Sequence, residues 1–314
     1  MSGQHLVVRA MTEADLPAAV LAYRRAFGTF LKLPDIERFR ADNRVIETRF
    51  ATDPAAAFVG EFDGKVVGSS VGMQWGSVFV IGPVSVDPEY WGCGMARAIV
   101  ERMVALIDVR GAKLGALFTF GHSPTHLRLY EGFGFAPQQL TLVTAKPVEG
   151  QASSEPFRLY SALGSDAQRV VLVQCRMLAD TLYPGLDLTR EIEAIAVQGL
   201  GETLLIEEGG RPAGFALCHI GAGTEAGEGV LFVKFAAAPL GDAGAFERLV
   251  AAVERLAAER GARTIIAGVN AARRGAYHLL QARGYRANFI GVAMHRPDEP
   301  GYQRPEVFAI DDWR

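Results

Sequence analysis

Two glycines stand two positions apart in the hexapeptide Trp91-Gly92-Cys93-Gly94-Met95-Ala96. Because glycine has no Cβ atom, Gly92 and Gly94 can adopt backbone dihedrals that other residues avoid, and a ligand can approach the main chain closely. At the start of a helix, the free N–H groups of such a loop bind a phosphate without needing a basic side chain. The spacing alone is also typical of a plain strand-to-helix turn, so both interpretations stand.

The segments on either side of the hexapeptide have the patterns of a strand and a helix. Residues 77–86 are rich in Val, Phe and Ile, which favours a strand. After the hexapeptide, residues 96–107 carry apolar side chains at helical spacing, with charged side chains on the other face. We therefore expect a strand, a short loop that contains Pro88, and an amphipathic helix that ends near Gly111.

Similar patterns divide the rest of the chain. In the first half we expect strands at 7–9, 57–62, 65–74, 114–120 and 140–144, and helices from Thr12 to about Phe27, within 31–50, and over 124–131. The second half repeats this order, with a hairpin at 207–214, strands at 230–238 and 264–269, and helices near 246–256 and 277–283. The segment 149–155, rich in Gly, Ser and acidic residues, predicts a linker. The chain is thus expected to hold two copies of one mixed α/β domain, 1–150 and 151–314, with a tail from about residue 299.

Composition excludes several classes of function. The chain has 32 Lys and Arg residues and 35 Asp and Glu residues without a long run of one sign, so no nucleic-acid partner is expected. No apolar run reaches the roughly 18 to 20 residues of a membrane span, and we expect a soluble cytoplasmic protein without a membrane partner. The three cysteines are widely spaced, which indicates reduced thiols. His122 and His126 have no third ligand nearby, so no metal site is expected.

With these elements in place, the first half resembles the GNAT superfamily of N-acetyltransferases, which bind acetyl-CoA. The hexapeptide is similar to the family's pyrophosphate loop, Gln/Arg-x-x-Gly-x-Gly/Ala, at every position except the first, where Trp91 stands. Leu129-Tyr130-Glu131-Gly132-Phe133-Gly134-Phe135 is similar to the family's Leu-Tyr-Glu-Lys-Leu-Gly-Phe segment. The resemblance covers residues 5–145 through these motifs and residues 157–297 through the order of elements only.

The resemblance implies tandem domains of the α/β (α+β mixed) class, each with a mostly antiparallel central sheet flanked by helices. It implies acetyl-CoA as a co-substrate and no metal. The backbone around Val84 and Val86 would pair with the pantetheine arm, and the loop N–H groups would bind the pyrophosphate. The full set of implied cofactor-binding residues is Val84, Ser85, Val86, Trp91, Gly92, Cys93, Gly94, Met95, Ala96 and Ser123. In catalysis, the N–H near Val84 would stabilise the developing oxyanion, and Tyr130 would return a proton to the leaving thiolate.

The second half departs from the family's motifs. Residues 236–245 lack Gly-x-Gly/Ala at the required place, and Asp242 would repel a phosphate. Leu280 stands where the first half has Tyr130. The sequence therefore predicts a second domain that keeps the fold without acetyl-CoA chemistry and that supports the acceptor site.

The expected function is that of an acyl-CoA-dependent N-acyltransferase, which transfers an acyl group, most simply acetyl, to an amine by direct attack. The alternative is a non-catalytic acyl-CoA-binding sensor or scaffold, which Trp91 and the second half favour and Tyr130 disfavours. The acceptor is either a small-molecule amine or a protein amine, and a homodimer is left open. Glu61 could deprotonate the amine through water, or it is simply a solvated strand carboxylate.

Overall fold

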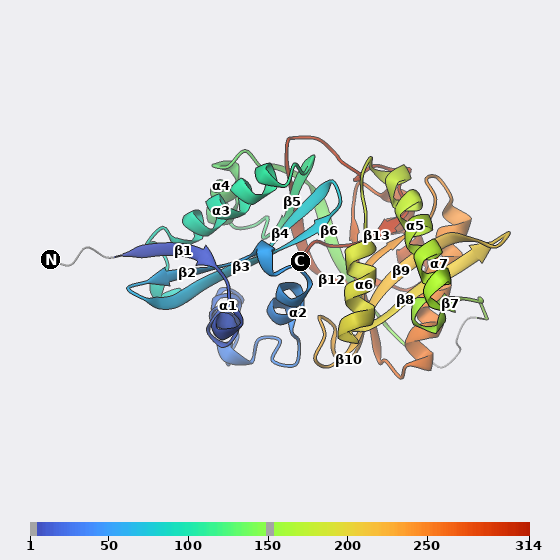
Figure 1. The fold of residues 1–314 in the computed structure, drawn as a ribbon, viewed down its shortest axis with the longest axis horizontal. Coiled ribbons are helices and arrows are strands. Elements are labelled where there is room, and N and C mark those ends of the chain that lie inside the picture. The colour runs from blue at the N-terminus through green and yellow to red at the C-terminus, as the bar shows by residue number, and fades with distance from the viewer. Residues whose placement is uncertain (1–4, 149–153) are drawn as a thin grey trace.

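The computed structural model describes residues 5–148 and 154–314, so most of the predicted linker, residues 149–153, lies outside the described residues. Within the described residues, one 13-stranded sheet runs the length of the molecule, and helices pack on its faces (Figure 1). The elements of the first half are β1 (Leu6–Ala10), α1 (Leu16–Phe30), α2 (Val45–Thr52), β2 (Ala57–Phe62), β3 (Lys65–Trp75), β4 (Val78–Val86), α3 (Met95–Val109), β5 (Leu114–Thr119), α4 (Pro124–Glu131) and β6 (Ala136–Pro147).

The second half has the same order of strands and helices. Its elements are β7 (Arg158–Leu159), α5 (Ser165–Leu182), α6 (Thr189–Gln198), β8 (Gly201–Glu208), β9 (Arg211–Gly221), β10 (Gly227–Ala237), α7 (Ala243–Glu259), β11 (Thr264–Asn270), α8 (Arg274–Ala282), β12 (Arg286–Arg296) and β13 (Ala309–Ile310). The predicted mixed α/β class and the internal repeat are confirmed. The helix predicted from Thr12 begins at Leu16, because Thr12 opens a 3₁₀ turn over Glu13–Asp15 first.

The two halves exchange their last long strands. β6 of the first half pairs with β11 of the second, with Asn270 opposite Thr141. β12 of the second half lies between β5 and β6 and pairs with β5, with Val292 opposite Thr119. Met294 of β12 is completely buried in the hydrophobic cluster of the first half. The sheet and the core are therefore continuous across the two halves, which the repeat in the sequence does not reveal.

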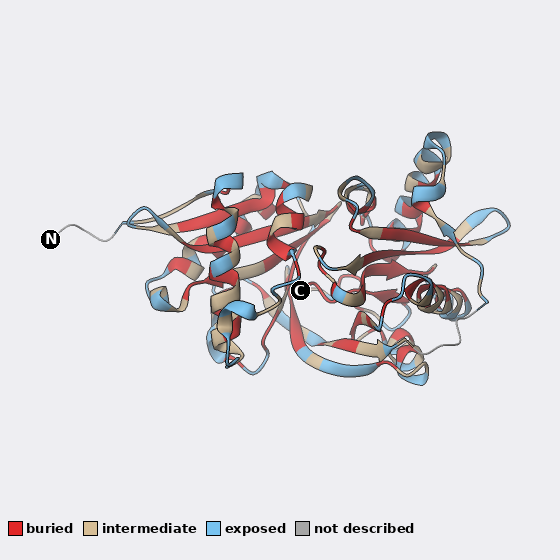
Figure 2. Cartoon of the chain, turned by 90° about the horizontal axis from the view of Figure 1, so that it is seen from below, coloured by how far each residue is buried: buried red, intermediate tan, exposed pale blue. Residues whose placement is uncertain are grey.

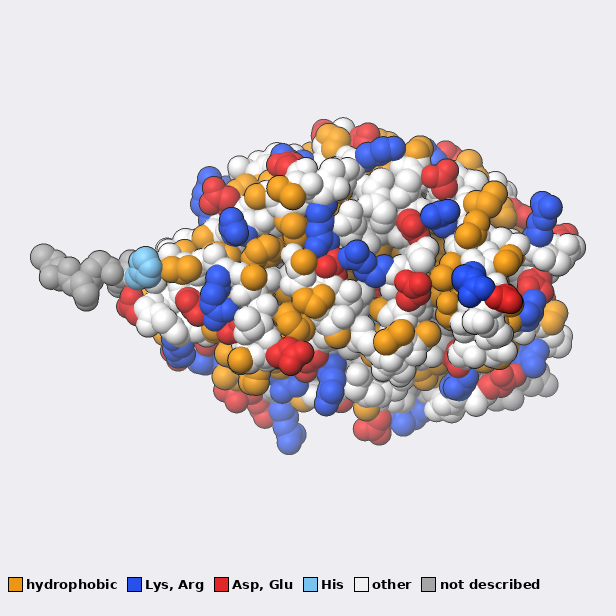
Figure 3. All heavy atoms as spheres, in the orientation of Figure 1, with side chains coloured by type: hydrophobic (Ala, Val, Ile, Leu, Met, Phe, Trp, Pro, Cys, Tyr) orange, Lys and Arg blue, Asp and Glu red, His pale blue; other side chains and the backbone are white. Residues whose placement is uncertain are grey.

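A buried cluster also joins the faces of the two halves. Trp75 and Val78 of the first half pack with side chains of α5, α6 and β9, and the Trp75 indole N–H donates a 3.1 Å hydrogen bond to Glu191. The strands are buried along most of their length, whereas the outward sides of the helices are exposed (Figure 2). Acidic and basic side chains are interspersed on the face drawn in Figure 3. In the described part of the chain, no helix is long and apolar enough to cross a membrane.

Candidate active site

β4 and β5 separate along their length and leave an opening between them. The two strands pair in parallel only from Val78 to Ile81 of β4. The N–H of Asp87 donates to the carbonyl oxygen of Val67 on β3 at 2.7 Å. Because neighbouring residues of a strand turn their backbone groups to opposite edges, Val84 and Val86 direct theirs toward the opening. The strand thus turns toward a ligand backbone groups that no neighbouring strand pairs with.

The first of two cavities at this opening, the loop cavity, has a volume of about 540 Å³. It is bounded by the end of β4, the hexapeptide, and the helices α1 and α4. Its lining includes most of the predicted cofactor-binding residues, namely Val84, Val86, Trp91, Gly92, Gly94, Met95, Ala96 and Ser123, together with Tyr130.

Two predicted cofactor-binding residues do not line this cavity. The Ser85 hydroxyl is buried and lies 3.0 Å from the hydroxyl of Ser69 on β3. Side chains alternate between the two faces of a strand, so the side chain of Ser85 lies on the opposite face from those of Val84 and Val86. Cys93 is exposed on the outer side of the loop, and its thiol is free. Any part that these two residues play therefore lies in holding the backbone of the strand and the loop.

The hexapeptide has the backbone of an anion-binding loop. Gly92 and Gly94 have φ angles of 83° and 89°, in the left-handed region that favours glycine, and α3 begins directly after Gly94. The N–H groups of Gly92, Cys93 and Gly94 donate no hydrogen bond to any residue in the described part of the chain. Unpaired N–H groups at a helix N-terminus suit phosphate oxygens, so the loop fits the pyrophosphate of a nucleotide coenzyme.

The side chain of Trp91, where the sequence departs from the family's motif, lies against the end of β4. Its indole N–H donates a 2.7 Å hydrogen bond to the carbonyl oxygen of Val86, while half of the side chain stays exposed. In this arrangement the indole uses one of the two strand positions that the resemblance assigns to the pantetheine arm.

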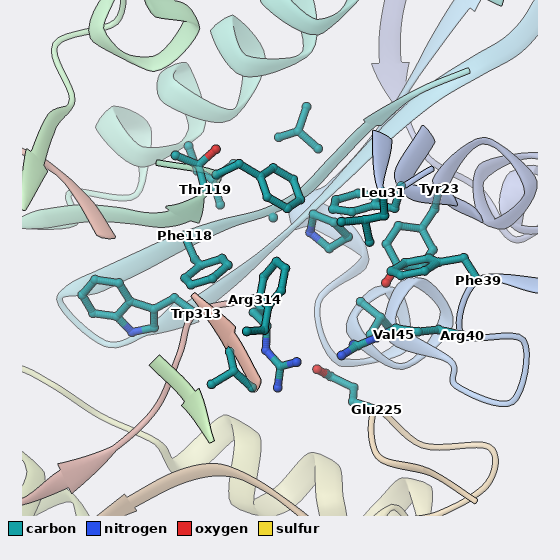
Figure 4. A pocket seen from close by; sticks show the side chains of 18 of the residues that line it. Tyr23, Leu31, Phe39, Arg40, Val45, Phe118, Thr119, Glu225, Trp313 and Arg314 are labelled. Atoms are coloured by element: carbon teal, nitrogen blue, oxygen red, sulfur yellow. The ribbon is translucent and has the colours of Figure 1, made fainter. Parts of the chain in front are cut away.

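A second cavity, the inter-half cavity, has a volume of about 290 Å³ and lies between the two halves of the chain (Figure 4). The first half contributes side chains from α1, α2, β5 and the segment before α2. The second half contributes β10, β11, β12 and the chain after β13. The walls are mostly aromatic and aliphatic, and the charged lining residues are Arg40, Arg49, Glu225 and Arg314.

Both cavities share the lining residues Phe27, Val84, Phe120, His126 and Tyr130, and they therefore meet at this point. Tyr130, on α4, is only 7% exposed, and burial raises the pKa of its phenol. No side chain in the described residues hydrogen-bonds to the Tyr130 hydroxyl, so its proton is free for a ligand. At neutral pH, the Tyr130 phenol is therefore protonated where the cavities join.

His126 is the second titratable group at the junction. Its Nδ1 lies 2.6 Å from the hydroxyl of Ser123, and its ring packs edge-on against Phe30 and Phe120. Burial lowers the pKa of His126, and the nearby His122 lowers it further. The ring is therefore neutral at pH 7 and able to accept a proton. His126 and Tyr130 lie one turn apart on α4, so their spacing in the sequence already places them on one side of that helix. From the sequence, we considered His126 only as a metal ligand.

The charged end of the inter-half cavity belongs to an ion network. Arg49 on α2 forms a 2.7 Å ion pair with Glu225, and Lys234 on β10 bridges Glu225 and Glu191 at 2.8 and 2.9 Å. Burial raises the pKa of Glu225, but the charges of Arg49 and Lys234 outweigh it and hold that pKa well below its usual range. Sequence reasoning missed this network, since Arg49 comes from the first half and its partner Glu225 from the second.

Glu61, the candidate base named from the sequence, lines neither cavity. Its carboxylate accepts hydrogen bonds of 2.9 and 2.6 Å from Arg9 on β1. Among the described residues, no group of three His, Cys, Asp or Glu side chains could hold a metal ion.

The corresponding opening in the second half is filled by the chain itself. β10 and β11 pair only as far as Val233, and beyond that point β13 lies between them. The N–H of Ala238 donates to the carbonyl oxygen of Phe308 at 3.1 Å, and the N–H of Asp311 donates to that of Gly268 at 3.0 Å. Residues 306–311, which include the short strand β13, thus fill the gap in the second half where the first half is open.

Comparison with known proteins matches part of the chain to one family. The acetyltransferase (GNAT) domain family matches residues 53–137. A mycothiol acetyltransferase from Cellulomonas flavigena is 28% identical over 124 residues, which are 35% of each of the two chains. The acetyltransferase SG1711 from Sodalis glossinidius is 30% identical over 101 residues, which are 32% of this chain and 71% of that protein.

Two solved structures share the fold over nearly the whole chain. A GCN5-related N-acetyltransferase from Sphaerobacter thermophilus has a TM-score of 0.61 at 18% identity and covers 94% of this chain and 96% of its own. A structure from Pyrococcus horikoshii assigned to the acetyltransferases has a TM-score of 0.69 at 16% identity and covers 100% and 96%. At these identities, the likeness establishes the fold alone.

Proposed function

Because the chain belongs to the GNAT superfamily of N-acetyltransferases, we propose that its first half transfers an acetyl group from acetyl-CoA to a small amine held between the halves. The observation that carries this proposal is the junction of the two cavities at Val84, His126 and Tyr130. A transfer reaction needs two substrates that meet at one point, with a proton donor and a proton acceptor beside them.

Acetyl-CoA would occupy the loop cavity. The unpaired N–H groups of Gly92, Cys93 and Gly94 suit its pyrophosphate, and the backbone of Val84 and Val86 suits the amides of its pantetheine arm. When bound, the coenzyme supplies an activated thioester carbonyl. Its acetyl end would lie at the junction, because there the loop cavity shares its lining residues with the inter-half cavity.

The amine would attack the thioester directly. Its nitrogen forms a bond to the carbonyl carbon, the carbon–sulfur bond breaks, and the sulfur leaves as a thiolate that takes the proton of Tyr130. The proton that the nitrogen loses goes to His126, which is neutral at pH 7 and so able to accept it. Exchange with solvent then restores the Tyr130 phenol. The N–H of Val84 faces the opening and would stabilise the developing oxyanion, an effect commonly worth about 3 kcal/mol for one donor.

The two halves would have different roles: residues 1–150 would bind the coenzyme, and residues 151–314 would complete the acceptor site. Two observations support this division. The tail strand β13 occupies the second half's opening, and β12, Trp313 and Arg314 form walls of the inter-half cavity. A small acceptor is favoured over a protein surface because the cavity is of small-molecule size.

The test is a thiol-release assay of the purified protein with acetyl-CoA and a panel of small amines. The proposal expects release of free CoA thiol that depends on the amine, with the acetylated amine identified by mass spectrometry. Coenzyme binding without release of thiol for any amine would support a sensor or scaffold instead.

A further inference from the structure

We propose that the acceptor is a small amine with a ring-sized apolar body and a carboxylate group, and that Arg40 binds the carboxylate. The inference rests on the proposed acetyl transfer and names the substrate class of the same site.

The walls of the inter-half cavity fit an apolar ring. Aromatic side chains approach from both halves: Phe39, Phe118 and Phe120 from the first, and Phe232, Phe289 and Trp313 from the second. At about 290 Å³, the cavity lies at the small end of ligand pockets and has room for a ring with short substituents. Flat apolar walls favour a planar body through burial and edge-to-face contacts.

Arg40 brings a positive charge to this apolar cavity, where the Tyr23 hydroxyl hydrogen-bonds to it and Asp312 acts on it only through its field. In the described residues, no Asp or Glu side chain forms an ion pair with Arg40, and its guanidinium lies 5.9 Å from the centre of the Phe39 ring. A guanidinium stays charged at any pH a protein tolerates, and Arg40 is partly buried, so an anion beside it lowers the cost of removing its charge from water. An acidic group on the ligand would remove that cost.

A second guanidinium adds to the positive potential. Arg314 lines the same cavity, and its charge lowers the pKa of Arg40 beyond the effect of burial. The Arg314 Nε is buried without a hydrogen-bond partner, although its terminal nitrogen lies 2.9 Å from Asp312. Two neighbouring positive charges, of which Arg314 keeps an unused donor, are stabilised by a bound anion.

Among the described residues that line the cavity, Glu225 is the single Asp or Glu, and its side chain already has partners. Glu225 accepts hydrogen bonds from Arg49 at 2.7 Å and from Lys234 at 2.8 Å. It is therefore unavailable as a counter-charge for Arg40 or as a site for a ligand's ammonium group.

The arrangement also orients the acceptor. Arg40 lines only the inter-half cavity, whereas His126 and Tyr130 line both cavities. The carboxylate would lie at Arg40, the ring between the aromatic walls, and the amine at the junction, where the thioester carbonyl would stand. The positive charge of Arg40 also repels an ammonium group from the Arg40 end of the inter-half cavity, so the amine is favoured at the junction.

The test compares acids with their uncharged amides in the thiol-release assay. The pairs are L-phenylalanine with L-phenylalaninamide, and 4-(aminomethyl)benzoate with 4-(aminomethyl)benzamide, so that two amine-to-carboxylate spacings are covered. For at least one pair, kcat/KM for the acid should exceed that for the amide by about tenfold or more. Arg40→Met should abolish the preference, and Arg40→Lys should keep part of it. Arg38→Met, in the same segment but exposed, should behave like wild type.

A second measurement separates binding from turnover. Binding of the preferred acid, followed by tryptophan fluorescence, should weaken about tenfold or more in Arg40→Met, while coenzyme affinity and the unfolding midpoint stay unchanged. Equal use of acids and amides by the wild type, or an acid preference that survives Arg40→Met, would overturn this inference and leave acetyl transfer intact. Failure of every amine to release thiol would overturn both.

Discussion

The indole N–H of Trp91 donates a 2.7 Å hydrogen bond to the carbonyl oxygen of Val86, on the edge of β4 that faces the loop cavity. A coenzyme arm that pairs with this strand would need the same oxygen. Coenzyme binding would therefore have to break the indole hydrogen bond, because the Trp91 indole and the coenzyme compete for the same carbonyl oxygen.

Trp91→Phe should consequently bind CoA more tightly. Removal of the indole N–H frees Val86, and the gain should be about 0.5–1.5 kcal/mol, the usual net worth of one hydrogen bond. Titration calorimetry measures the change. Tyr90→Phe, which removes the hydroxyl of a neighbouring lining residue and keeps the indole hydrogen bond to Val86, serves as the control. Weaker binding by Trp91→Phe would mean that the indole stays in place and contacts the coenzyme.

Gly94→Ala should weaken coenzyme binding, because Gly94 has a φ of 89° that a residue with a Cβ adopts only at a cost of about 1–2 kcal/mol. Relaxation of that strain would turn the loop N–H groups away from the phosphates. Gly111→Ala is the matched control, since Gly111 has a φ of 64° just past the other end of α3. Both variants should lose similar stability, and only Gly94→Ala should lose affinity for CoA.

The sequence predicted most elements because their causes are local. Apolar periodicity placed α3, α4 and the hairpin of β2 and β3 within a few residues of their observed bounds. The sequence did not predict the pairing partners of β6 and β12, because the alternation of apolar and polar residues in a strand is the same whichever strand it pairs with. For that reason one stretch of chain predicted the strand and loop side of the loop cavity, but not the wall that α1 adds to it. For the inter-half cavity, the sequence predicted only that the second half supports the acceptor site, and it did not single out Arg40, Glu225 or Trp313.

Glu225→Gln should destabilise the fold by about 3–5 kcal/mol, because it leaves the buried charges of Arg49 and Lys234 without their shared partner. Urea unfolding measures the loss. The exposed pair Arg255 and Glu259 is the control, and Glu259→Gln should cost less than about 0.5 kcal/mol.

The same carboxylate predicts a dependence of stability on pH. The folded-state pKa of Glu225 lies well below its ordinary value of 4.5, so its contribution is full above pH 4.5 and disappears as the pH falls through the folded-state pKa. The wild type should lose stability on acidification more steeply than Glu225→Gln. Parallel curves for the two proteins would show that Glu225 is not held ionised by its partners.

Phe308→Ala should impair the acceptor site and spare the coenzyme site. The Phe308 ring packs on Phe246 and holds β13 in the second half's opening, from which the tail continues to Trp313. Its loss should cost about 3–5 kcal/mol of stability and raise KM for the acceptor, with the Kd for CoA unchanged. An equal loss of coenzyme affinity would mean that the two cavities do not depend on separate halves.

His126→Gln should remove the acidic limb of the pH profile. Burial and then His122 lower the pKa of His126 from 6.5, so wild-type kcat/KM should fall as the pH drops through a value below 6.5. His122→Gln is the matched control: it removes one cause of the shift, and the limb should move upward toward pH 6.5. Retention of the limb in His126→Gln would assign the base to another group.

The central claim, that Tyr130 donates the proton to the leaving thiolate at the junction of the cavities, is tested most directly by the turnover of Tyr130→Phe across the pH range. The variant removes only a hydroxyl that bonds to no described side chain, so its fold and its Kd for CoA should match the wild type. The predicted result is a fall in kcat of about a hundredfold or more. Unchanged kcat at every pH would contradict the claim.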